Sequence, residues 1–355
     1  MDEDDPFSSI AAQPPALSAE AAVDIAREHY GLDVSASPLV SERDQNFLLR
    51  GADGSRAILK IANVAEPLDV TRFQIEALLH IEKHGDAGLG VPTIIRSTTG
   101  ASDIEVRSAQ GNHLCRLVSF LPGTLLEDDV ADDAVARSLG TTLARLDQAL
   151  EGFSHPGEKQ ALLWDMKQAP ALRRLLPHVT DDAERALLTA TLDEFEADAV
   201  PAFATLPRQV IHNDANPANV LLAKDRSVAG VIDFGDMLRS PRIIELGVAG
   251  AYLRVLEGNP LSLIVELVAG FHAVAPLARD EVMVLHSLIK ARLASTLLIL
   301  AWRRHLRGPE DQYLAAASES EADALPFLQR LSDIPTENAA AIYSQVCASV
   351  AAAAR

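Results

Sequence analysis

The periodicity of the sequence changes at Leu121-Pro122-Gly123, and this change limits the folds that the chain can adopt. Residues before it alternate between apolar and polar positions around short Gly-containing turns, which predicts β-hairpins over 46–61 and 103–120. Residues after it carry apolar side chains at helical spacing, as in the stripe from Val135 to Leu150. The expected architecture is therefore α+β and bilobal, with a β-rich N-lobe and a larger, mainly helical C-lobe.

Each lobe also contains elements of the other kind. Helices are expected in the N-lobe over 19–30 and 69–83, and in the C-lobe over 181–199 and from about 243 onwards. Three short strands are expected inside the helical part, at 209–211, 220–222 and 228–234. We therefore divide the chain into a mobile N-terminal segment (1–18), an N-lobe (19–120) and a C-lobe (121–355).

Composition narrows the class of partner and the compartment. The chain has 31 Lys and Arg against 50 Asp and Glu, a formal net charge of −19, which argues against nucleic acid or an anionic membrane as a partner. Cys115 and Cys347 lie far apart without a CxxC neighbour, which favours a reduced, cytoplasmic protein. The acidic start differs from a signal peptide, and the short apolar stretch from Leu293 to Trp302 is expected to be a core helix.

The strongest chemical signal lies among the three short strands of the C-lobe. Asp214 follows His212-Asn213, Asn219 comes five positions later, and Asp233 follows an apolar strand. Phosphoryl transfer from a nucleotide requires a carboxylate that orients the attacking hydroxyl and oxygen ligands that hold Mg²⁺ on the phosphates. We expect Asp214 to be the catalytic base, and Asn219 and Asp233 to be the metal ligands.

These strings carry a family resemblance. His212-x-Asp214-x-x-x-x-Asn219 with Asp233-Phe234-Gly235 resembles the catalytic loop and metal motif of the protein-kinase-like superfamily. The His-Asn-Asp form is similar to the aminoglycoside phosphotransferase and choline kinase branch. The longer strings, 211–221 and 42–48, look most like the hydroxylysine kinase subgroup. The resemblance implies a nucleotide between the two lobes, with either ATP or GTP as the phosphoryl donor.

The resemblance also implies roles for N-lobe residues. Lys60, near the end of a predicted strand, is expected to bind phosphates, and Glu76 on the next helix is expected to pair with it. The stretch 41–47 takes the place of a glycine-rich loop, and Ser41 and Asn46 are its candidate phosphate ligands.

The segment that joins the lobes is the candidate site for the nucleobase. By analogy with kinase hinges, Ser119 and Leu121 are expected to offer backbone groups to the base, with Phe120 packing nearby.

The sequence constrains the identity of the acceptor molecule less than that of the phosphoryl donor. Asp236 and Asp165 are candidate partners for a substrate ammonium, Trp164 offers a cation–π face, and Arg239 is a candidate for a carboxylate. An ammonium, a carboxylate and a hydroxyl together describe a hydroxy amino acid.

Several acceptors and one other class of function stay open. We rank a hydroxylysine-like amino acid first, homoserine or choline and ethanolamine second, and an aminoglycoside third. A nucleotide-binding pseudokinase without turnover is the alternative of another class. A protein kinase is disfavoured, because Asp236 and Arg239 follow Asp233-Phe234-Gly235 almost at once and leave little room for a peptide-binding segment.

Overall fold

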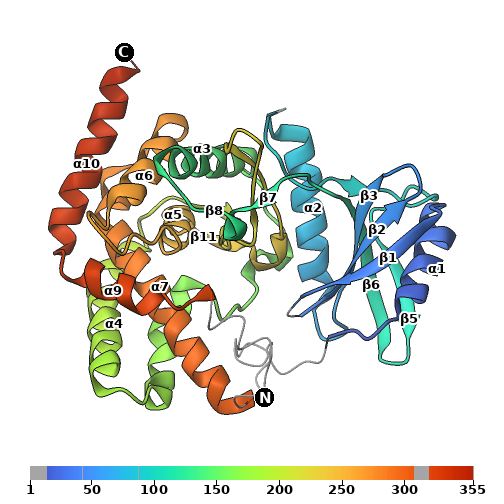
Figure 1. Ribbon diagram of the computed structural model, residues 1–355, viewed down its shortest axis with the longest axis horizontal. Helices are drawn as coiled ribbons and strands as arrows, with labels where there is room; N and C mark the ends of the chain where they lie inside the picture. Colours follow the sequence, from blue (N-terminus) through green and yellow to red (C-terminus); the bar gives the residue numbers. More distant parts are fainter. Residues whose placement is uncertain (1–13, 42, 87, 308–319, 355) are drawn as a thin grey trace.

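The computed structural model describes residues 14–41, 43–86, 88–307 and 320–354. Figure 1 shows two lobes, one built on a β-sheet and one built mainly of helices. The N-lobe sheet has the strand order β1-β2-β3-β6-β4, and β5 pairs with β6, all antiparallel. Its strands are β1 (Val34–Leu39), β2 (Gln45–Gly51), β3 (Arg56–Ile61), β4 (Ile94–Ile95), β5 (Ile104–Ser108) and β6 (Gly111–Ser119). Both predicted hairpins, β2–β3 and β5–β6, are therefore confirmed.

Two helices complete the N-lobe. α1 (Ala19–Tyr30) begins at Ser18, whose hydroxyl accepts a hydrogen bond from the Ala21 amide. α2 (Leu68–His84) lies between the sheet and the C-lobe (Figure 1). Residues 1–13 of the predicted mobile segment lie outside the described residues. Its last part is anchored, because the Leu17 amide donates to the Gln45 side chain at 2.9 Å.

The strands of the C-lobe form two small sheets that hold the catalytic motif. One has the order β10-β9-β7 and the other pairs β11 with β8. They comprise β7 (Thr124–Leu125), β8 (Arg208–Ile211), β9 (Val220–Leu222), β10 (Val228–Val231) and β11 (Leu238–Pro241). The three strands expected from the sequence are thus present, but β8 belongs to a different sheet from β9 and β10.

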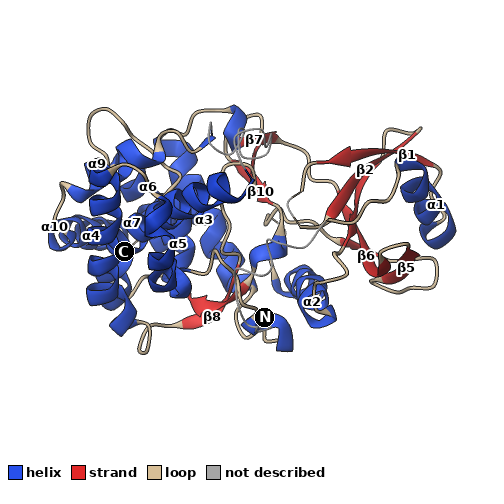
Figure 2. Cartoon of the chain, turned by 90° about the horizontal axis from the view of Figure 1, so that it is seen from below, coloured by secondary structure: helices blue, strands red, loops and turns tan. Residues whose placement is uncertain are grey.

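Helices make up the rest of the C-lobe and enclose its core (Figure 2). They are α3 (Asp133–Ala149), α4 (Asp182–Ala202), α5 (Ile243–Gly250), α6 (Ser262–Val274), α7 (Arg279–Arg307), α9 (Ala324–Ser332) and α10 (Thr336–Ala353). Short 3₁₀ segments are η2 (Leu126–Asp128), η3 (Pro156–Lys159), η4 (Met166–His178) and η5 (Phe234–Asp236). α7 is long and apolar enough to cross a membrane by length and composition, but it is largely buried inside the lobe, as a core helix is.

One apolar cluster crosses between the lobes and fixes the site. Phe73 of α2 and Val118 of β6 belong to the same buried cluster as Leu146 of α3 and Phe234 of η5. Burial of such large side chains is worth roughly 1.5–3 kcal/mol each. The sheet that carries Lys60 is thereby packed against the segment that carries Asp233.

Candidate active site

The catalytic loop leaves β8 at Ile211 and is held by a neutral histidine. His212 is fully buried; its Nε2 donates to the Ile232 carbonyl at 3.0 Å and its Nδ1 accepts from the Asp214 amide at 3.3 Å. Burial lowers the pKa of His212 to about 4, so the ring is uncharged at neutral pH. This arrangement makes His212 a support for the loop rather than a proton carrier.

Glu245 of α5 supports the next residue of the loop. Asn213 has a φ of 65°, a region that non-glycine residues seldom adopt. Its amide donates to Glu245 Oε2 at 3.0 Å, and its side-chain Nδ2 donates to the Asp236 carbonyl at 3.2 Å. Glu245 is fully buried, and burial raises its pKa to about 7. These bonds tie the loop to α5 and to η5, and they hold its strained turn in place.

Glu245→Ala should therefore destabilise the fold. The substitution leaves the buried Asn213 amide without its acceptor, which costs about 1–3 kcal/mol of unfolding free energy. Glu245→Gln keeps an oxygen at that position and should lose distinctly less. Urea denaturation of the three proteins measures the difference. Equal losses for Ala and Gln would show that the hydrogen bond to the loop contributes nothing.

Asp214 stands at the tip of the loop with two asparagines around its carboxylate. Asn216 Nδ2 donates to Asp214 Oδ1 at 3.0 Å, and Asn219 Nδ2 donates to Oδ2 at 2.7 Å. Burial, and next the negative charge of Asp236, raise the pKa of Asp214 to about 8. Neutral donors thus orient the carboxyl group, and a pKa this near to neutral pH is in the range that suits a general base.

Asp233 is the second carboxylate of the motif. It has a φ of 62°, and its Oδ1 lies 2.9 Å from Nζ of Lys60, which belongs to the N-lobe. The Lys60 ammonium is the main reason that the pKa of Asp233 lies well below its usual range. The Ile232 amide donates to the Asn219 carbonyl at 2.9 Å, so the structure brings the two predicted metal ligands onto adjacent backbone.

The expected pairing of Lys60 with Glu76 is not formed. Lys60 pairs with Asp233, whereas Glu76 is exposed and lies 3.7 Å from His155 Nε2. The reason is the phase of α2, because residues two positions apart point to nearly opposite sides of a helix. Gln74 faces the sheet and accepts a hydrogen bond from Arg116, so Glu76 faces outwards.

The loop that replaces a glycine-rich turn reaches the C-lobe through an arginine. Arg43 forms an ion pair with Asp236, a link between the lobes that the sequence analysis did not identify. Asn46 is buried in register with Lys60 on the neighbouring strand, so both side chains share one face of the sheet. Ser41 is half-buried at the start of the loop, and Glu42 lies outside the described residues.

The segment that joins the lobes is ordered on its N-lobe side. The Ser119 amide donates to the Thr93 carbonyl at 2.9 Å, and its hydroxyl accepts from the Thr93 amide at 2.9 Å. The Arg56 guanidinium stacks on the Phe120 ring, 3.9 Å from its centroid. Phe120 and Leu121 are half-buried. Their positions are compatible with a nucleobase site, whose contacts stay a prediction.

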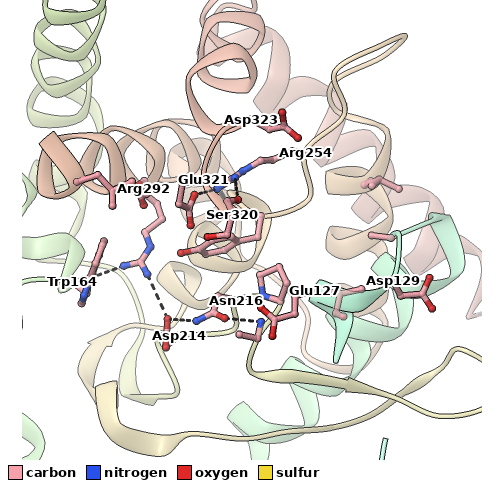
Figure 3. Close-up of a pocket in the computed structure, with 18 of the residues that line it drawn as sticks. Glu127, Asp129, Trp164, Asp214, Asn216, Arg254, Arg292, Ser320, Glu321 and Asp323 are labelled. Atoms are coloured by element: carbon pink, nitrogen blue, oxygen red, sulfur yellow. Dashed lines mark hydrogen bonds and ion pairs between the residues drawn. The ribbon is translucent and has the colours of Figure 1, made fainter. Parts of the chain in front are cut away.

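A cavity of about 540 Å³ opens beside Asp214 on the C-lobe side (Figure 3). We call it the C-lobe cavity. Its walls come from η2, the catalytic loop, the loop after α5, one face of α7 and the residues that lead into α9. Glu127 and Asp129 lie on one side, and Arg292 and Trp164 lie on the other (Figure 3). A small polar molecule in this cavity would present its groups directly to Asp214.

Of the four residues predicted to bind the acceptor, two line this cavity and two pair with neighbouring side chains instead. Asp236 and Trp164 line the cavity. Asp165 caps η4, accepts from the Lys167 amide at 2.9 Å and pairs with Lys167 Nζ at 3.0 Å. Arg239 on β11 lies 3.7 Å from Glu158 and outside the cavity wall. The structure therefore does not bring Asp165 and Arg239 to the acceptor side, because their partners are local.

The sequence analysis did not identify the arginines of the cavity wall, two of which lie on α7. Arg292 and Arg303 lie on α7, are 2% and 3% exposed, and both approach the Trp164 ring. Trp164 therefore already has two arginines of the chain as cation–π partners. Charged residues within an otherwise apolar, buried helix are costly. The two arginines within an apolar stretch were visible in the sequence, but no sequence pattern indicated that they would lie beside the catalytic loop.

The match to known proteins agrees with this geometry. Residues 35–277 match the model of the phosphotransferase enzyme family, a range that includes the N-lobe sheet, the catalytic loop and Asp233. The chain belongs to the phosphotransferase enzyme family. The hydroxylysine kinase of Danio rerio is 26% identical over 89% of this chain and 92% of that protein. The hydroxylysine kinase of Mus musculus is 24% identical over 92% of each chain.

Solved structures of phosphotransferases share the fold. A microcompartment-associated aminopropanol kinase has a TM-score of 0.66 at 18% identity, covering 89% of this chain and 97% of its own. An amicoumacin kinase, solved in complex with AMP-PNP, Ca²⁺ and Ami, has a TM-score of 0.63 at 14% identity, covering 87% of this chain and 93% of its own. The bilobal, protein-kinase-like fold expected from the sequence is confirmed.

Proposed function

We propose that this phosphotransferase transfers the γ-phosphoryl group of ATP or GTP to the hydroxyl of a small hydroxylated amine or amino acid, with a hydroxylysine-like molecule first. The observation that carries the proposal is the position of Asp214. Its carboxylate faces a polar cavity large enough for a small molecule and lies in the same motif as Asp233, which pairs with Lys60. The phosphoryl donor and the acceptor hydroxyl would therefore meet at Asp214.

The residues on the donor side fit a divalent metal. Asn219 uses its amide nitrogen on Asp214, which leaves its side-chain oxygen for another partner. Asp233 is half-exposed and ionised. An amide oxygen and a carboxylate, with phosphate oxygens, make the kind of oxygen set that Mg²⁺ takes. When bound, the ion would neutralise charge on the phosphates, while Lys60 would bind phosphate oxygens.

The chain's own residues would do the remaining work by position. Asp214 would accept a hydrogen bond from the acceptor hydroxyl and take its proton as the new O–P bond forms and the bond from the γ-phosphorus to the bridging oxygen breaks, which releases the nucleoside diphosphate. Asn216 and Asn219 would keep the carboxylate aimed at that oxygen. The pairing of Arg43 with Asp236 would hold the two lobes together around the donor. Positioning of this kind contributes much of the rate in phosphoryl transfer.

The choice of acceptor is supported by the cavity and by the relatives. The cavity wall carries both acidic and basic side chains, which suits a molecule with an ammonium and a carboxylate. The curated relatives matched over most of their length are hydroxylysine kinases. Homoserine, choline, ethanolamine and aminoglycosides remain the alternative acceptors.

A product assay tests the proposal. The protein is incubated with Mg²⁺, ATP or GTP, and one of 5-hydroxylysine, homoserine, choline, ethanolamine or kanamycin, and products are identified by mass spectrometry. We expect a phosphorylated product from 5-hydroxylysine. A product from another acceptor alone would reassign the substrate. Nucleotide binding without a phosphorylated product from any acceptor would favour a non-catalytic nucleotide-binding protein.

A further inference from the structure

One face of α7 forms a wall of the C-lobe cavity. Arg292, Thr296, Leu300 and Arg303 follow one another at intervals of three or four residues, which places them in a row along the helix. Arg292 is 2% exposed, yet it belongs to the cavity wall next to Asp214. An arginine is seldom buried to this extent unless its charge has a use or a partner.

Arg292 hydrogen-bonds to Trp164 and Tyr252, but these partners leave the Nε of its guanidinium without a hydrogen bond within the described residues. Nη1 donates to the Trp164 carbonyl at 3.2 Å, and the group stacks 4.7 Å from the centre of the Trp164 ring. Tyr252 also approaches it. Its nearest carboxylate oxygen, Asp214 Oδ1, is 3.6 Å from Nη2, longer than a hydrogen bond. Nε is buried and has no hydrogen-bond partner within the described residues. A planar anion would complete this set of donors.

Some of the other charged side chains in the cavity wall already have an ion-pair partner. Arg254 forms an ion pair with Glu321, and Asp129 lies 3.2 Å from Arg226. Glu127 and Asp323, by contrast, have no ion pair within the part of the chain that the structure describes. The cavity thus offers a buried cation beside the catalytic carboxylate and acidic side chains elsewhere. This distribution of charge is complementary to an amino acid rather than to a simple amine.

We propose that Arg292 determines specificity by binding the carboxylate of a hydroxy amino acid, and that it positions Asp214 at the same time. The inference rests on the proposed phosphoryl transfer and deepens it. Because Arg292 lies 3.6 Å from Asp214, a bent conformer of a hydroxy amino acid can bring its carboxylate to the guanidinium while its hydroxyl reaches Asp214. The fork of an arginine matches a carboxylate through two parallel hydrogen bonds, which a lysine does not reproduce.

A matched pair of acceptors tests this role. 5-Hydroxylysine and 1,5-diamino-2-pentanol differ only in the carboxylate. In the unmodified protein the KM of the diamino alcohol should exceed that of hydroxylysine by about tenfold or more, the value of one good ionic contact. Arg292→Lys should raise the KM of hydroxylysine by a similar factor and leave the KM of the diamino alcohol nearly unchanged. The ratio of the two KM values should therefore approach one.

The controls separate this role from a structural one. Arg239→Gln, which changes an arginine outside the cavity, should keep the unmodified protein's KM ratio. If Arg292→Lys lowers kcat equally for both acceptors and keeps their KM ratio, Arg292 only positions Asp214 and the proposal is overturned. If Arg292→Lys fails to fold, as thermal unfolding would show, the unmodified protein still decides: equal KM values for the two acceptors overturn the proposal. Phosphorylation of neither acceptor would instead overturn the hydroxylysine-like acceptor of the proposed function, on which this inference rests.

Discussion

Asp214→Asn should lower kcat by about 10³-fold while nucleotide affinity stays within about twofold. The substitution keeps the shape of the side chain but removes the oxygen that accepts the hydroxyl proton, and general-base catalysis is typically worth 10²–10⁴ in rate. Lys60 pairs with Asp233 rather than with Asp214, so the phosphate-binding lysine should keep its position. Steady-state kinetics and calorimetric titration with nucleotide measure the two quantities.

A carboxylate elsewhere in the same lobe provides the control for Asp214→Asn. Asp225 is an exposed loop residue whose hydrogen bonds, among the residues that the structure describes, lie within its own turn, with Ser227 Oγ at 2.7 Å. Asp225→Asn should keep kcat within about twofold, as surface substitutions usually do. An Asp214→Asn protein with unchanged kcat would contradict the assignment of the base, whatever the acceptor is.

Asp233→Asn should abolish the dependence of nucleotide binding on Mg²⁺ and lower kcat/KM by about 10³-fold. The carboxylate would be both the charged ligand of the metal and the partner of Lys60, at 2.9 Å. Loss of one preorganised electrostatic group of this kind typically costs 10²–10³ in rate. Calorimetric titration with nucleotide, with and without Mg²⁺, should show a large difference for the unmodified protein and almost none for the variant.

A structural effect of Asp233→Asn would appear in a different measurement. If the variant merely disturbs the fold, its thermal unfolding temperature should fall and nucleotide affinity should drop equally with and without Mg²⁺. If Mg²⁺ still strengthens nucleotide binding by the same factor in a stable variant, Asp233 is not a metal ligand.

The local patterns of the sequence were the reliable ones. The hairpin that carries Lys60 and the three strands around Asp214 were predictable, because turn residues and the alternation of apolar and polar side chains mark them directly. The spacing from Asp214 to Asn219 lies within one loop, so the sequence alone indicated that these side chains meet, as their 2.7 Å hydrogen bond shows.

Contacts between distant segments were the ones that the sequence could not give. The spacing from Lys60 to Glu76 resembled a kinase ion pair, but the phase of α2 places Gln74 on the sheet side. Arg239 was close to the motif in sequence, whereas β11 pairs with β8 and keeps Arg239 near Glu158. Arg292 reaches Asp214 only because α7 folds back against the catalytic loop, which no local pattern encodes.

The ³¹P NMR spectrum of a reaction with Mg²⁺, ATP or GTP, and 5-hydroxylysine tests the central claim most directly. Transfer to the hydroxyl predicts one new phosphate monoester for each nucleoside diphosphate formed, its signal split by the single hydrogen on the carbon that carries the oxygen. The Asp214→Asn protein should give almost none of it. Nucleoside diphosphate with free inorganic phosphate and no monoester would show hydrolysis without transfer, and would contradict the assignment of a hydroxylysine-like acceptor to this cavity.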